Sequence, residues 1–157
     1  MKKNYIKILI ALIILVPVIY AASFFLVVPL MHDAKLREFS SPLLSIEVPQ
    51  NTARLDNLTK IGQQFTNGNH CDYLAAILIK SSLSKSDIEK YYGGKYNGKS
   101  TLRFVWLDEE NMYTKDTPDS AKIFSLRDWI KQLGSSGTAV VYTFEPNMTS
   151  SFDYRCS

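Results

Sequence analysis

The feature that most constrains this chain is an apolar run from Ile8 to Leu30 that contains no charged residue. As a helix rising 1.5 Å per residue, the run would extend about 34 Å, enough to cross a hydrocarbon core of about 30 Å. One charged side chain at the centre of such a helix would cost roughly 2.5–3.5 kcal/mol on insertion. The run avoids that cost along its whole length, so the sequence predicts a transmembrane helix over residues 8–30.

The residues that precede this helix indicate its orientation. Lys2, Lys3 and Lys7 lie in the flank of residues 1–7, and basic residues favour the cytoplasmic side of a membrane. We therefore expect a single-pass protein of the cell membrane, with a cytoplasmic N-terminus and an extracytoplasmic C-terminal part. The membrane is its first predicted partner, through residues 8–30.

A cleaved signal peptide is the alternative to an anchor, because small residues follow Tyr20 in the stretch Tyr20-Ala21-Ala22-Ser23. A cut there would place bulky Ile19 or Tyr20 at the third position before the cleavage site. The apolar run also continues through residues 24–28, so cleavage would leave an apolar new N-terminus. The sequence favours an uncleaved anchor.

Charge excludes one class of partner. The chain has 18 basic and 15 acidic residues, and three of the lysines lie in residues 1–30, which hold no acid. The remainder is electrically balanced. Nucleic-acid binding depends on clustered excess Lys and Arg, so no nucleic-acid partner is expected.

The rest of the chain divides into a connector and one domain. Residues 31–41 are rich in helix formers and predict a stalk that extends the anchor helix by two or three turns until Pro42. Residues 42–157 are enough for one globular domain with a buried core.

Alternation and apolar runs predict the strands of this domain. The run at residues 71–80 is apolar on both faces and predicts a central strand, although a buried helix has a similar pattern. The other expected strands are residues 43–48, stopped by Pro49, and residues 55–65, 102–107, 138–144 and 152–156.

Two short helices are expected between the strands. Ser84 and Asp87 resemble a capping box that begins a helix ending near Tyr92, before Gly93-Gly94. Ser125 and Asp128 repeat this pattern before a second helix that Gly134 closes. We therefore predict an α+β fold with a mostly antiparallel sheet and two short helices, and the repeated helix–strand order hints at a split βαβ arrangement.

Cys71 and Cys156 are the only cysteines. Outside the cytoplasm two cysteines usually pair. The bridge would close a loop of about 85 residues and contribute roughly 4–5 kcal/mol on the chain-entropy model. The sequence therefore predicts a disulfide, and two unpaired thiols are the alternative.

The sequence holds few residues suited to catalysis or metal binding. His70 adjoins Cys71, but neighbouring residues of a strand point to opposite faces, and a disulfide would consume the nucleophile. His32 is expected beside the membrane, and two distant histidines do not complete a zinc site. Phosphate-binding, dinucleotide-binding and hydrolase-elbow motifs are absent. We therefore predict no metal, no cofactor and no catalytic residue.

An acidic stretch, residues 108–119, is the one candidate for enzyme chemistry. It carries Asp108, Glu109, Glu110, Asp116 and Asp119. These carboxylates could hydrolyse envelope polymers or ligate calcium, but their spacing singles out no pair and matches no EF-hand. A solvated loop is favoured.

Tyr91, Tyr92 and Tyr96 surround small polar residues and form the best candidate for a binding surface. The alternative is that one tyrosine packs under the helix end and the others lie on a loop. The sequence favours a non-catalytic, membrane-anchored envelope protein that binds a partner protein or polymer, with an envelope hydrolase as the alternative.

Overall fold

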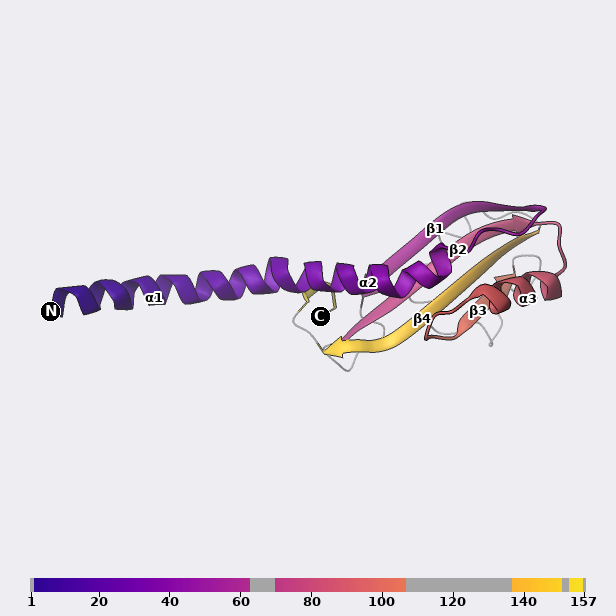
Figure 1. Ribbon diagram of the computed structural model, residues 1–157. Coiled ribbons are helices and arrows are strands. Elements are labelled where there is room, and N and C mark those ends of the chain that lie inside the picture. Colours follow the sequence, from indigo (N-terminus) through magenta and orange to yellow (C-terminus); the bar gives the residue numbers. More distant parts are fainter. Residues whose placement is uncertain (1, 63–69, 107–136, 151–152, 157) are drawn as a thin grey trace.

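The computed structural model describes residues 2–62, 70–106, 137–150 and 153–156 (Figure 1). A long N-terminal helix leads into an α+β domain with a four-stranded antiparallel sheet. The helix projects far beyond the domain at its N-terminal end and lies along the sheet at its C-terminal end. The predicted fold class is confirmed in this form, an apolar N-terminal helix followed by an antiparallel sheet.

The N-terminal helix runs without a break through three segments. These are α1 (Lys2–Ala22), the π-helical turn η1 (Ser23–Val27) and α2 (Val28–Leu44). The wide turn comes just before Pro29, whose ring would meet the carbonyl of Phe25 in a regular helix. The amide of Val28 donates to Ser23 instead, so the chain stays helical.

The first half of this helix is apolar on every side and packs against nothing in the described part of the chain. Every side chain from Tyr5 to Ala21 is exposed. Over Tyr5–Leu44 the helix is long and apolar enough to cross a membrane. A helix that exposes apolar side chains all round is suited to lipid rather than to water.

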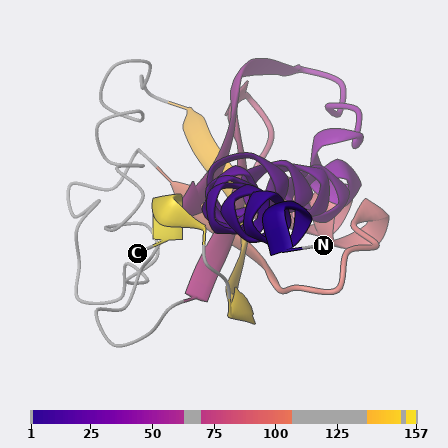
Figure 2. The same cartoon turned by 90° about the vertical axis from the view of Figure 1, so that its left-hand side faces the viewer.

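The second half of the helix forms part of the domain, as Figure 2 shows in a view along the helix axis. Residues 31–41 are helical as predicted, but they lie against the sheet rather than forming a free stalk. The buried positions of α2 recur at helical spacing and define one face; they include His32, Ser40 and Leu43.

The end of α2 corrects two predictions. Pro42 does not stop the helix, which continues to Leu44, and residues 43–48 form no strand. Both errors have the same cause: Leu43 and Ile46 are buried in the core, and this packing outweighs the local alternation. The guanidinium of Arg54 donates to the carbonyls of Leu44 and Ile46 and so satisfies groups that the helix end leaves open.

The sheet has the strand order β1-β2-β4-β3, and each neighbouring pair is antiparallel. Its central strand β2 (His70–Ser81) is buried on both faces from Cys71 to Ile79, which confirms the central strand predicted for residues 71–80. The other strands are β1 (Thr52–Gly62), β3 (Leu102–Trp106) and β4 (Thr138–Ser150).

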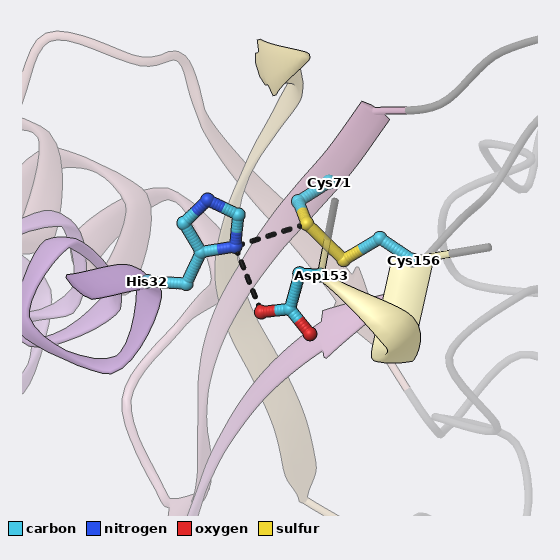
Figure 3. Close-up of side chains that lie close together, drawn as sticks. All are labelled: His32, Cys71, Asp153 and Cys156. Atoms are coloured by element: carbon cyan, nitrogen blue, oxygen red, sulfur yellow. Dashed lines mark hydrogen bonds and ion pairs between the residues drawn. A yellow bond between two sulfur atoms is a disulfide. The ribbon is translucent and has the colours of Figure 1, made fainter. Parts of the chain in front are cut away.

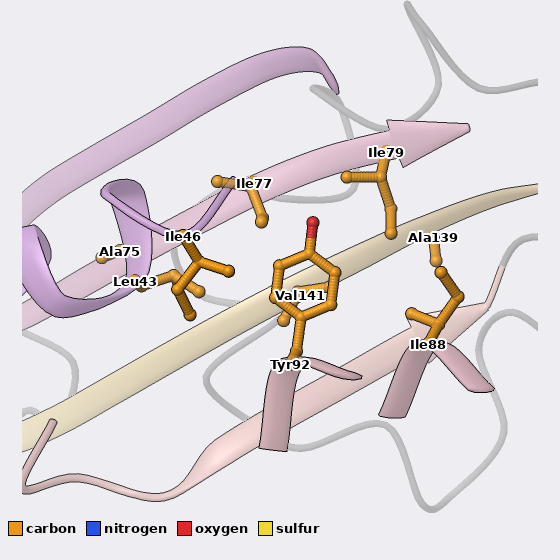
Figure 4. Packing of buried hydrophobic residues seen from close by; sticks show 9 residues of the cluster. All are labelled: Leu43, Ile46, Ala75, Ile77, Ile79, Ile88, Tyr92, Ala139 and Val141. Carbon is orange, nitrogen blue, oxygen red and sulfur yellow. The ribbon is translucent and has the colours of Figure 1, made fainter. Parts of the chain in front are cut away.

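The main core lies between one face of the sheet and the helices α2 and α3 (Lys85–Lys95), as Figure 4 shows. This cluster contains Ile88 and Tyr92 of α3, Leu43 and Ile46, and apolar side chains of β2 and β4; Ile88 lies at the opposite end of it from Leu43. A second buried cluster lies on the opposite face of the sheet and contains Leu74, Ala76, Leu78, Val140 and Tyr142.

Helix α3 begins as predicted. The Ser84 hydroxyl accepts a hydrogen bond from the amide of Asp87 and caps the helix. The helix does not end at Gly93-Gly94 but continues to Lys95. The amide of Tyr96 donates to the carbonyl of Tyr92 at 2.8 Å and closes the last turn.

The prediction of two short helices is not matched. The helix expected near residues 125–133 lies outside the described residues, and α2 takes a place on the sheet that the sequence did not predict. The terminal strand expected at residues 152–156 is also wrong, because Tyr154–Cys156 forms the 3-10 turn η2.

Candidate functional site

Three segments that are far apart in the sequence meet where the N-terminal helix joins the domain (Figure 3). His32 comes from α2, Cys71 from the start of β2, and Asp153 and Cys156 from the C-terminal turn. All four residues are at most 3% exposed. We call these four residues the joint cluster.

Cys71 and Cys156 lie at disulfide distance, with Cα atoms 5.1 Å apart, in the pairing predicted from the sequence. The bridge links the C-terminal turn to the central strand. Tyr73 lies in the same buried cluster, and Leu36 and Phe39 of α2 pack against it. The sulfur atoms are therefore enclosed by the helix and the sheet.

The imidazole of His32 lies between the bridge and a carboxylate. Its Nδ1 atom is 2.9 Å from Oδ2 of Asp153 and 3.2 Å from Sγ of Cys71. The sequence did not predict this contact between His32 and the bridge. His70, the immediate neighbour of Cys71, has its Nε2 atom 3.7 Å from Oδ1 of Asp72 instead.

Arg155 holds the carboxylate in place. Its guanidinium donates to both carboxylate oxygens of Asp153, to Oδ1 of Asp33 at 2.6 Å and to the carbonyl of Pro29 at 2.9 Å. Burial acts to raise the pKa of Asp153, but the hydrogen bonds and the charge of Arg155, together with His32, outweigh it and lower that pKa. The carboxylate is therefore ionised at neutral pH.

The joint cluster does not have the geometry of a catalytic triad. In a triad one imidazole nitrogen binds the carboxylate and the other serves the nucleophile. Here Nδ1 of His32 faces both the Asp153 carboxylate and the Cys71 sulfur. The sulfur is also bonded to Cys156 and buried. The cluster therefore joins segments and offers several ligand atoms that converge on one point, but it does not relay a proton to a nucleophile.

Aromatic side chains mark the outer edge of the joint. Tyr154 is 49% exposed and lies beside two residues of η1, with its ring 5.8 Å from that of Phe25 and 6.4 Å from that of Phe24. Tyrosine and other amphipathic aromatics favour the interface between membrane and water. The C-terminal turn therefore lies beside the apolar part of the N-terminal helix.

A groove of about 460 Å³ opens on the domain between α2 and the loop that follows α3. Its volume falls in the range of about 300–1,000 Å³ that is typical of ligand sites. Phe39 and Tyr96 give it apolar walls, and its charged side chains have both signs, Lys35 and Lys99 against Glu38 and Glu145.

The three tyrosines predicted to bind a partner have different surroundings. Tyr96 lines the groove, and its hydroxyl donates to Oγ1 of Thr143 at 3.1 Å. Tyr91 is half-buried and donates to the carbonyl of Glu47. Tyr92 is fully buried in the core, so it offers no surface to a partner. The loop at residues 108–119 lies outside the described residues.

Sequence reasoning missed the joint cluster because His32 and Asp153 are 121 residues apart. One signal was present. His32, Leu36 and Phe39 recur at helical spacing in the predicted stalk, residues 31–41, and Leu43 continues the spacing. This stripe indicates a buried face, and a histidine within it indicates a buried polar contact.

Comparison of the chain with protein-family models, curated proteins and solved structures found no match. The function is therefore argued from the structure alone.

Proposed function

We propose that this protein is a single-pass membrane protein that holds a small non-catalytic binding domain at the extracytoplasmic surface of the cell membrane. The observation that carries the proposal is the unbroken helix Tyr5–Leu44. Its first half is apolar and exposed, and its second half packs against the domain. A flexible tether would let the domain drift away from the bilayer. This helix fixes its height and orientation.

The contacts of the joint support such rigid attachment. The disulfide and the Arg155 network bind the C-terminal turn to β2 and to the first turns of α2. The domain is thus fastened to the helix next to the proposed span. Lys7 and its neighbours favour a cytoplasmic N-terminus, and in that orientation the domain would lie outside, where a disulfide is stable.

The groove is the proposed contact site for the partner, which we take to be an extracytoplasmic polypeptide. Exposed Asn97 and Lys99 border it together with the aromatic ring of Tyr96. Mixed charges and an aromatic wall are suited to a polar peptide surface. Lys35 and Glu38 lie on α2 within about one and a half turns of Asp33, so the partner would also bind close to the membrane.

Photocrosslinking in the native membrane tests this proposal. A photoreactive amino acid at Asn97 or Lys99 of the full chain should give the same crosslinked protein from both positions. Lys90, an exposed residue of α3 that does not line the groove, is the matched control. Absence of crosslinks at both groove positions, or the same products from Lys90, would contradict the proposed binding site.

A further inference from the structure

The joint cluster contains more than a disulfide requires. Each of its four residues offers one ligand atom, and these four atoms all lie within 4.8 Å of one another. A disulfide needs only Cys71 and Cys156. The convergence of the His32 imidazole and the Asp153 carboxylate on the same buried point is typical of a metal site.

The four ligand types suit zinc. Zinc binds thiolate sulfur at about 2.3 Å, imidazole nitrogen at about 2.0–2.1 Å and carboxylate oxygen at about 2.0–2.2 Å in tetrahedral sites, so its ligand atoms lie roughly 3.3–3.8 Å apart. Nδ1 of His32 is 3.2 Å from Sγ of Cys71 and 2.9 Å from Oδ2 of Asp153. Shifts of a few tenths of an ångström, about 0.3–0.5 Å, bring both distances to tetrahedral values.

The surroundings also match a metal site. Carboxylates that bind metals are themselves hydrogen-bonded, and such outer contacts orient the ligand. Arg155 donates to both oxygens of Asp153. Two thiolates and one carboxylate around Zn²⁺ would leave one net negative charge, and the guanidinium of Arg155 lies in place to balance it.

We propose that the chain, when its disulfide is reduced, binds one zinc ion through Cys71, Cys156, Nδ1 of His32 and the carboxylate of Asp153. A dithiol reductant supplies two electrons and two protons, which convert the bridge to two thiols while the reductant becomes a disulfide. Zn²⁺ then displaces the two thiol protons to solvent and binds the thiolates. The disulfide and the metal are thus alternative cross-links within the joint cluster.

Cobalt binding to the full chain tests the proposal directly. The chain is made by cell-free synthesis in detergent micelles with a phosphine reductant and Co²⁺, so that both thiols are free when it folds. We expect the absorption of a tetrahedral cobalt–thiolate site, with one metal per chain, and its loss when Zn²⁺ is added. Oxidised chain should show no such absorption. Reduced wild-type chain without it would overturn the proposal.

Single substitutions distinguish the four-ligand site from a bare pair of thiols. Cys71→Ser should weaken the cobalt–thiolate absorption, because one of the two thiolates is lost. Asp153→Asn and His32→Gln should each weaken zinc binding by more than the 10- to 100-fold that loss of an outer contact costs. His70→Asn, outside the cluster, is the control and should bind as wild type.

Circular dichroism identifies the variants that fold, and only those are compared. Unchanged zinc affinity in folded Asp153→Asn or in folded His32→Gln would contradict the assignment. The wild-type cobalt spectrum decides the proposal where neither variant folds.

Discussion

Tyr92 brings a hydroxyl group into the centre of the apolar core. Its side chain is fully buried, and no hydrogen-bond partner for the hydroxyl is present among the described residues. Burying a hydroxyl without a partner costs about 1–3 kcal/mol. Tyr92→Phe keeps the ring and removes this group, so we expect it to raise the free energy of unfolding by about 1 kcal/mol or more.

The same burial makes stability depend on alkaline pH. Desolvation raises the pKa of Tyr92 to about 12, against about 10 for an exposed tyrosine. The folded state therefore holds the hydroxyl proton more tightly than the unfolded state does. The free energy of unfolding is unaffected by this group below pH 10 and falls as the pH rises from 10 through 12. A difference of about two pH units corresponds to about 3 kcal/mol. Tyr92→Phe should remove this loss.

Chemical denaturation of the full chain in detergent micelles, followed by near-ultraviolet circular dichroism, measures both effects. Tyr91→Phe is the matched control, because it removes a hydroxyl that donates to Glu47 on the surface and leaves the core intact. Tyr92→Ala should cost about 3–5 kcal/mol, because it removes a large side chain from the core and leaves a cavity. A Tyr92→Phe variant less stable than wild type, with unchanged alkaline behaviour, would refute the reasoning.

Three further predictions concern the joint, and each is measured by the same denaturation. Arg155→Ala should lower the free energy of unfolding by about 2–3 kcal/mol, because it leaves the buried carboxylate of Asp153 without its cation. The control Arg103→Ala, at an exposed residue, should change the free energy of unfolding by about 0.5 kcal/mol or less. Equal effects of the two substitutions would contradict the network of Arg155. Because the pKa of Asp153 is lowered, its stabilising contribution should be full above about pH 4 and disappear as the pH falls through the folded pKa. A free energy of unfolding that stays constant down to pH 2 would show that Arg155 does not stabilise the carboxylate. Cys71→Ser with Cys156→Ser should cost about 4–5 kcal/mol, since the bridge spans 85 residues; an unchanged midpoint would show that the thiols are not paired.

The elements that the sequence predicted correctly have strong local signals. The run of β2 predicts a strand buried on both faces, because the side chains that alternate to either face are apolar. Ser84 and Asp87 define the start of α3 by a contact between residues three apart. The cysteine pairing followed from the number of cysteines and from the predicted extracytoplasmic location.

The elements that were predicted wrongly depend on packing between distant segments. Residues 43–48 alternate like a strand, but Leu43 and Ile46 are placed by the core between α2 and the sheet. Pro42 is tolerated in the helix for the same reason. His32 could not be linked to Asp153 because nothing local in the sequence reports a contact between the N-terminal helix and the C-terminal turn.

The central claim is that one uncleaved helix anchors the domain outside the membrane, and a C-terminal fusion tests it most directly. A reporter enzyme active only outside the cytoplasm is fused after Ser157, and its activity is measured with the size of the fusion in membrane and soluble fractions. The account predicts full activity from a full-length fusion that stays in the membrane after carbonate extraction. An inactive reporter, or a shortened active fusion released into the soluble fraction, would contradict it.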